Sequence, residues 1–135
     1  WYFLQQWQGQ KAVQELAENL ERVKREDYER AMADTYGGKT PQETLQMYIE
    51  AVEKGDYELA SKYFIGDKQA EELEKLKNTK NDVLKTYLGY IKNVFPWRSS
   101  LDDKNFVMEA KTDLGPSIFI RFIKYPNNIW KIIEI

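Results

Sequence analysis

Residues 40–64 carry the signals that most constrain the fold, because they start a helix, stop it and start another. Thr40 is a predicted N-cap, since its hydroxyl can accept a hydrogen bond from a free backbone N–H of the first turn. Pro41 follows at the first helical position, where its missing N–H costs nothing, and Glu43 completes a capping box. These signals predict a helix that begins at residue 41.

The apolar residues of this stretch predict which helix faces are buried. The i, i+3, i+4, i+7 spacing of one buried face is met by Leu45, Tyr48, Ile49 and Val52. Gly55 can adopt the left-handed conformation that ends a helix, and Asp56 can cap the next one. The apolar residues of that second helix are Leu59, Ala60, Tyr63 and Phe64. The stretch therefore predicts two helices packed on a common core.

Two more helices are predicted before the strands begin. Asp67 can start the first, and we assign its charged run EELEKLK to a solvated face. Its inward-facing residues are Ala70, Leu73 and Leu76. The second follows Asn81 and is stopped by Pro96, which cannot continue a helix. Its apolar face consists of Leu84, Tyr87, Leu88 and Ile91.

The chain then changes from a helical period to the alternation typical of strands. The predicted strands are residues 105–112, 117–125 and 129–135, with a weaker one at 97–101. On the first of them Phe106, Met108 and Ala110 share one side. Helices followed by an antiparallel meander indicate the α+β class, with the N-terminal helices packed on a C-terminal antiparallel sheet.

The predicted strand 117–125 is apolar on both faces. One face carries Ile118, Ile120 and Phe122, and the other carries Phe119, Ile123 and Tyr125, interrupted by Arg121. An antiparallel strand with one solvated face should be polar on that face. We therefore expect helices to cover the first face, and a second copy, the N-terminal helix or a ligand to cover the second. An acid such as Glu134, or one on a second copy, would satisfy the charge of Arg121.

Residues 10–34 are predicted to form a long charged helix. Its apolar residues step by three, four and three, as in a coiled coil, and are Val13, Leu16, Leu20 and Val23. Acid-before-base pairs at i, i+4 spacing support the helix, namely Glu18–Arg22, Glu21–Arg25 and Glu26–Arg30. The seam ends before Asp27, so two alternatives stay open: a stalk that packs on a second copy, and a helix laid on its own domain. We expect residues 1–39 to be this stalk-like or juxtamembrane segment, with a flexible joint at 36–39.

Residues 1–7, WYFLQQW, are strongly aromatic. Trp and Tyr concentrate where a transmembrane helix leaves the bilayer, which predicts a membrane anchor upstream of this segment. Seven residues cannot themselves span a bilayer, which takes about 20. Lys11 is the only base before Arg22, and this scarcity of positive charge favours a non-cytoplasmic side.

The composition excludes several kinds of chemistry. The chain has no cysteine and no histidine, so cysteine nucleophiles, Cys/His zinc sites, disulfides and histidine-based dyads or triads are absent. The net charge of −2 is spread over interspersed acids and bases, so we expect no nucleic-acid surface. We also expect no metal site and no cofactor. The run GGKT is no phosphate-binding loop, because Ala33 stands where the first glycine of that loop belongs.

The stretch AVEKGDYELASKYF at residues 51–64, with the capped helix before it and the later hairpin that carries a Trp, resembles the NTF2-like superfamily. The resemblance covers residues 40–135. It implies a cone in which helices pack into the concave side of a curved antiparallel sheet. The superfamily includes enzymes, ligand binders, transport adaptors and secretion scaffolds, so the fold alone does not decide the function. Many of its enzymes use a pocket His–Asp pair, which this chain cannot form.

Three functions are compatible with these observations. The resemblance favours a non-enzymatic, extracytoplasmic interaction or scaffold domain tethered to a bacterial membrane, which self-associates through the sheet or the N-terminal helix and binds an unknown protein partner. The first alternative is a small-molecule binder with an aromatic pocket. The residues that would form this pocket are Tyr48, Tyr87, Met108 and Trp130, with Arg121 for an anionic group. The other alternative is an isomerase-type enzyme that uses a carboxylate base, with Glu109, Asp113 and Glu134 as candidates.

Overall fold

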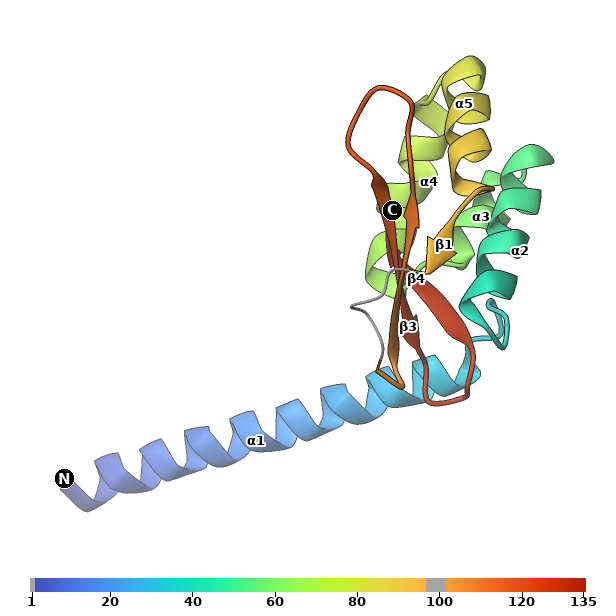
Figure 1. Ribbon diagram of the computed structural model, residues 1–135. Helices are drawn as coiled ribbons and strands as arrows, with labels where there is room; N and C mark the ends of the chain where they lie inside the picture. Colours follow the sequence, from blue (N-terminus) through green and yellow to red (C-terminus); the bar gives the residue numbers. More distant parts are fainter. Residues whose placement is uncertain (1, 97–101) are drawn as a thin grey trace. The chain divides into compact units, whose positions relative to one another are not determined.

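The computed structural model describes residues 2–96 and 102–135, and it confirms the α+β class (Figure 1). The helices are α1 (Tyr2–Ala33), α2 (Pro41–Glu53), α3 (Tyr57–Lys62), the 3-10 turn η1 (Gly66–Lys68), α4 (Gln69–Asn78) and α5 (Asn81–Ile91). The strands are β1 (Phe95–Pro96), β2 (Asn105–Ala110), β3 (Ile118–Lys124) and β4 (Trp130–Glu134). They form one antiparallel sheet in the order β1-β2-β3-β4. The weaker strand predicted at 97–101 lies outside the described residues.

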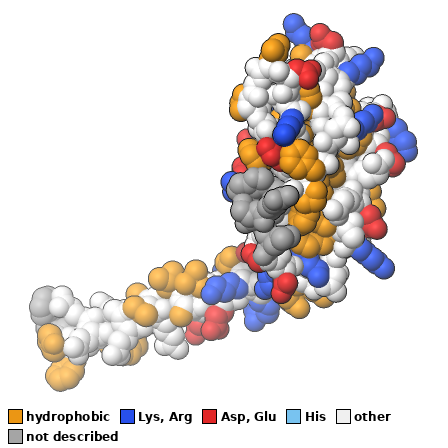
Figure 2. Space-filling model, viewed as in Figure 1, with side chains coloured by type: hydrophobic (Ala, Val, Ile, Leu, Met, Phe, Trp, Pro, Cys, Tyr) orange, Lys and Arg blue, Asp and Glu red, His pale blue; other side chains and the backbone are white. Residues whose placement is uncertain are grey.

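The chain divides into two compact units, Trp1–Asp34 and Thr35–Ile135. The first contains α1, a continuous helix of 32 residues in which the aromatic residues from Tyr2 to Trp7 and the predicted helix from residue 10 onward form one element. It has no buried residue, and the predicted seam residues Val13, Leu16, Leu20 and Val23 are 46% to 68% exposed. Near its end Arg30 pairs with Asp27, at i, i+3 spacing instead of the predicted i, i+4. A lone helix has no core, so only something outside α1 can cover its apolar side chains, some of which are visible in Figure 2.

α2 begins as the sequence predicts. Thr40 Oγ1 accepts a hydrogen bond from the Glu43 backbone N–H at 3.1 Å, and Pro41 is the first helical residue. Glu43 Oε2 in turn accepts from the backbone N–H of Lys39 at 3.0 Å, so the capping box closes one residue before the predicted position. The predicted inner face is confirmed, since the buried residues of α2 include Leu45, Tyr48, Ile49 and Val52.

The break between α2 and α3 is also confirmed. Gly55 has a φ of 76°, a left-handed conformation that suits glycine. Asp56 Oδ1 accepts from the backbone N–H of Leu59 at 3.2 Å and caps α3. Gly55 and Asp56 therefore explain why α2 ends and α3 begins at this point of the chain.

The orientation of α4 differs from the prediction. The chain enters it through η1, so the helix begins at Gln69 rather than at Asp67. Ala70 is exposed instead of buried, whereas the side chain of Glu72, assigned to a solvated face, is only 14% exposed. Leu76 is buried as predicted. The inner face of α4 therefore includes Glu72 and not Ala70.

α5 buries the predicted face and ends before the predicted stop. Leu84, Leu88 and Ile91 are buried, and the helix ends at Ile91. Pro96 instead lies in β1, at the edge of the sheet. An edge strand tolerates proline because its missing N–H can face away from the ladder.

β2 and β3 carry the core on one face of the sheet. Met108 pairs with Ile120, and Phe106 with Phe122, which brings alternate residues onto the helix-covered face. The pairing of β3 with β4 shifts between Arg121 and Phe122. On the opposite face Arg121 Nε lies 3.1 Å from Glu134 Oε1, the ion pair expected from the sequence.

β4 also bonds to the segment that precedes α2. The backbone N–H of Trp130 donates to the carbonyl of Gly38 at 2.9 Å. Buried Thr44 accepts from the Gly38 N–H at 2.9 Å and donates to the Trp130 carbonyl at 2.9 Å. A Cβ at Gly37 would lie 2.4 Å from that carbonyl, so the close approach requires glycine. The prediction of a flexible joint at 36–39 was therefore wrong, because this segment is packed on β4.

Lys131 binds two further segments to β4. It is fully buried, and its Nζ donates to the carbonyl of Tyr36 at 2.8 Å and to that of Lys62. Beside it, the N–H of Ile132 donates to the Tyr63 carbonyl at 2.9 Å, and the Ile132 carbonyl accepts from Ile65 at 2.9 Å. β4 is thus the strand that holds the sheet, α2 and the end of α3 together.

Replacement of Thr44 by valine should test this junction. Valine keeps the shape of threonine but removes the acceptor for Gly38 and the donor for Trp130. We expect the free energy of unfolding, measured by urea denaturation, to fall by about 1–3 kcal/mol. Thr86→Val is the control, because the Thr86 hydroxyl donates to the exposed Asp82 carbonyl of its own helix, and it should cost less than about 0.5 kcal/mol. Equal losses in the two variants would contradict a special role for Thr44.

Candidate functional site

A pocket of about 250 Å³, which we call the phenol pocket, lies between α2, α4 and α5. The residues that line it include Tyr48, Glu72, Lys75, Leu76, Val83 and Tyr87. Glu72 reaches it because residues four apart share one face of a helix, and Leu76 is buried on that face. Lys75 Nζ lies 3.3 Å from Glu72 Oε1, which pairs the carboxylate at the rim.

The two phenols of this pocket are held in the protonated state. Burial raises the pKa of Tyr48 well above its ordinary value, the negative charge of Glu72 raises it further, and a hydrogen bond with Tyr87 acts in the opposite direction. Burial also raises the pKa of Tyr87, with added contributions from Tyr48 and Glu72. At neutral pH both groups can donate hydrogen bonds, but neither can serve as a phenolate base or nucleophile. The pocket is suited to hold a small molecule that has an acceptor atom, and not to catalysis by a tyrosinate.

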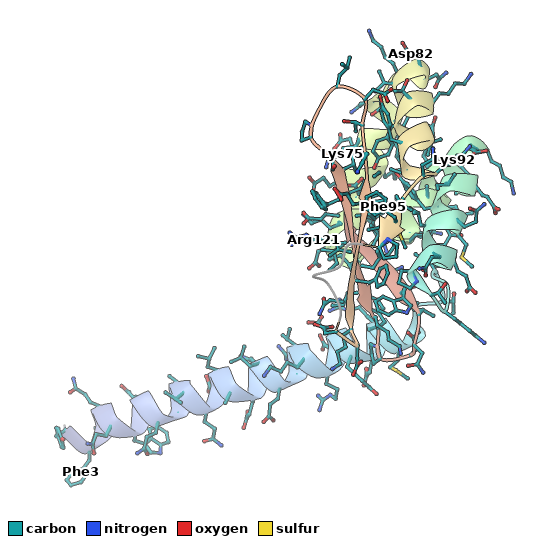
Figure 3. The ribbon with its side chains drawn as sticks, in the orientation of Figure 1. Phe3, Lys75, Asp82, Lys92, Phe95 and Arg121 are labelled. Atoms are coloured by element: carbon teal, nitrogen blue, oxygen red, sulfur yellow. The ribbon has the colours of Figure 1, made fainter. Side chains whose placement is uncertain are left out.

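The five residues predicted to bind a small molecule lie in three places. Tyr48 and Tyr87 line the phenol pocket. Met108 and Trp130 are buried core residues. Arg121 lies on the other face of the sheet and projects from β3 on the side away from α2 (Figure 3). The period-2 rule already places Arg121 opposite to its neighbour on the core face.

Glu72 and Lys75 are pocket residues that the sequence analysis missed. Both belong to the charged run that we assigned to solvent. The signal was present in the sequence, because Glu72 is four residues before the apolar Leu76 and shares its face of the helix. Each charged residue in such a run therefore has to be assigned to a face of the helix before it is predicted to be exposed to solvent.

The outer sheet face is the second candidate surface, and we define it by Val107, Phe119, Arg121, Ile123 and Glu134. Phe119 is 41% exposed, and Ile123 is half-buried. A shallow cavity of about 290 Å³ includes four of these residues. Tyr125, the third predicted interface residue, lies beyond the end of β3 with its ring centroid 5.9 Å from Lys131 Nζ. The face combines exposed and half-buried apolar side chains with one ion pair.

The candidate carboxylate bases are distributed over different elements. Glu109 lies on β2 opposite Phe119, and Glu134 is paired with Arg121. Asp113 Oδ2 accepts a 3.4 Å hydrogen bond from the hydroxyl of Tyr90. Among residues 2–96 and 102–135, no group of three or more acidic side chains is arranged to hold a metal ion.

No family model, no curated protein and no solved structure matches this chain. Within the described part of the chain, no helix has both the length and the apolar character needed to cross a membrane.

The raised pKa values of the buried phenols predict that the protein loses stability in alkali. Above about pH 10 the unfolded chain releases its phenolic protons while folded Tyr48 keeps its own, so the free energy of unfolding must fall as pH rises. Between about pH 10 and 11.5, Tyr48→Phe should make this slope shallower by up to about 1.4 kcal/mol per pH unit. Identical slopes for Tyr48→Phe and the unchanged chain in urea titrations would show that Tyr48 ionises normally.

Proposed function

We propose that this protein is a non-enzymatic interaction domain that works as a self-associating scaffold. The observation that carries the proposal is the uncovered seam of α1, because a helix of 32 residues places four apolar side chains in a heptad-like row and buries none of them. Exposed contiguous apolar surface usually marks a contact with another molecule. A second copy of α1 is the partner that this row fits, since identical seams are self-complementary.

The residues beside the seam also suit a second copy. With Val13 and Leu20 at heptad position a, the flanking positions are Ala12 and Ala17, which are small and let two helices approach closely. In a parallel pair of helices, position g of one copy contacts the following position e of the other. Here this places Asn19 of one copy against Lys24 of the other, so no like charges face each other at these positions. The seam spans about two heptads, which predicts weak association that needs support from a second contact or from a tether.

The outer sheet face is the alternative contact. Phe119 and Ile123 supply its apolar part, and the Arg121–Glu134 pair neutralises the charge that would otherwise oppose burial. Dimerisation through this face stays a prediction. It would add to the α1 contact in an assembly that uses both.

Tethering at the extracytoplasmic face of a bacterial membrane is part of the proposal. Its support is the aromatic first part of α1, where Tyr2, Phe3 and Trp7 are exposed. Trp and Tyr side chains prefer the headgroup region of a bilayer. Confinement to a membrane would raise the local concentration of the chains and so favour their weak association through the seam.

We also keep the NTF2-like cone as a proposal. Its support is the order of the elements, in which α2 to α5 precede an antiparallel sheet that they cover on one face. The small-molecule function has less support, because only Tyr48 and Tyr87 of its five residues share a pocket. The isomerase-type function has still less, since its candidate bases Glu109, Asp113 and Glu134 lie on different elements and none of them lines the phenol pocket.

Self-association through α1 is tested by sedimentation equilibrium of the full chain. We expect a reversible dimer that Leu20→Glu weakens at least tenfold, because each copy would then bury an unpaired carboxylate in the seam. Gln14→Glu adds the same charge outside the seam and should leave the dimer intact. A chain that stays monomeric at all concentrations, or a dimer that survives Leu20→Glu but is lost in Phe119→Lys, would contradict the α1 contact.

Membrane contact by the first part of α1 is tested by co-sedimentation with lipid vesicles. We expect the double variant Phe3→Ser, Trp7→Ser to bind vesicles several-fold more weakly than the unchanged chain, because it loses two interfacial aromatics. Tyr28→Ser removes an exposed aromatic farther along the same helix and should bind normally. Equal vesicle binding by all three proteins would remove the support for a membrane location.

A further inference from the structure

A groove of about 580 Å³ lies between the end of α2 and one side of α5. Its floor is apolar, since Val52 of α2 and Leu84 and Leu88 of α5 line it and expose only small edges. Leu84 separates it from the phenol pocket, which this residue also lines. The volume is in the range of sites that hold small organic molecules.

The rim of this groove is positively charged. Lys54 at the end of α2 and Lys85 and Lys92 on the α5 side all line it, and Figure 3 labels Lys92 at the end of α5. Among the described residues that line the groove, Glu53 is the one acid, and its Oε1 lies 2.6 Å from Lys92 Nζ. In the part of the chain that the structure describes, no carboxylate lies within salt-bridge distance of Lys54 or Lys85. Two of the three ammonium groups are thus available to an anion.

The Glu53–Lys92 pair bridges α2 and α5 across the groove. An anion that enters would compete with the Glu53 carboxylate for Lys92 Nζ. The pair is exposed, so its own stabilisation is small and it can open at low cost. Glu53 therefore acts as an internal competitor that weakens the binding of anions.

We propose that the α2–α5 groove binds a small amphipathic anion, an apolar ring or short chain that carries a carboxylate or sulfonate. The apolar part lies on Val52, Leu84 and Leu88, where burial of apolar surface supplies most of the affinity. The charged group lies at the rim, near Lys54 and Lys85. Attraction at an exposed rim is modest and is screened by salt, so it selects anions over neutral molecules of the same shape. This site is independent of the scaffold function and uses none of the residues of the α1 seam.

The test uses two fluorescent probes of similar shape, the anionic 8-anilinonaphthalene-1-sulfonate and the uncharged N-phenyl-1-naphthylamine. In titrations of the full chain at low salt, Lys85→Gln and Lys54→Gln should each weaken binding of the anionic probe about two- to fivefold and leave the neutral probe unchanged. Glu53→Gln should strengthen binding of the anionic probe by a similar factor, because it frees Lys92. Lys77→Gln, the same charge change on α4 outside the groove, is the matched control and should have no effect.

A competition arm separates the ligand chemistry from the dye. Octanoate should displace the anionic probe at lower concentration than octanol does, and added salt should remove this difference. Thermal melts of each variant verify that the fold is intact, which is expected because all four substituted side chains are exposed. Weaker binding in Lys77→Gln that equals the loss in Lys85→Gln, or no gain in Glu53→Gln, would overturn the proposal. So would equal displacement by octanoate and octanol at low salt.

Discussion

The structure depends on the way β4 satisfies polar groups that the core encloses. A buried ammonium is costly unless hydrogen bonds compensate for the lost water, and the Lys131 ammonium donates to the backbone carbonyls of Tyr36 and Lys62. Thr44 does the same for the backbone at the start of α2, where its hydroxyl bonds to both Gly38 and Trp130. These bonds fix the distance and angle of α2 to the sheet. Residues of α2 line both the phenol pocket and the α2–α5 groove, so the shapes of both depend on this junction.

The parts of the fold that could be predicted are those with a local cause. The start of α2 at Pro41, its cap at Thr40 and its stop at Gly55 each need only residues within one turn, and the strands follow from alternation. The parts that could not be predicted have a distant cause. Nothing near Lys131 in the sequence indicates that carbonyls 95 and 69 residues away will receive its ammonium. From the sequence alone Gly37 suggests a flexible joint, and only the structure shows that the backbone carbonyl of Trp130 lies against it.

The same distinction explains the candidate site. Tyr48 and Tyr87 could be assigned to inner faces of helices, because the helical period places them there. Their convergence on one pocket with Glu72 depends on how α2, α4 and α5 pack together, which no local pattern encodes. Because successive side chains of a strand point to opposite faces of the sheet, the sequence could have shown that Arg121 does not share a face with Met108 and Trp130. The fold class was therefore predictable, and the composition of the pocket was not.

Weak contacts that add together are the basis of the functional proposal. The α1 seam is short, the aromatic start of α1 offers a second attachment, and the outer sheet face offers a third. Each alone is modest, but contacts that act on one assembly multiply through effective concentration.

The central claim is that two copies meet along α1, and a distance between the two helices tests it most directly. Because the chain has no cysteine, Glu18→Cys introduces a single site for a spin label, on the α1 surface away from the seam and level with its middle. Pulsed electron–electron double resonance on the full chain should then give a narrow distance distribution at about 20–30 Å, for either helix orientation, since packed helix axes are about 8–10 Å apart. A signal with no dipolar coupling in that range, at concentrations where the protein is dimeric, would contradict the account.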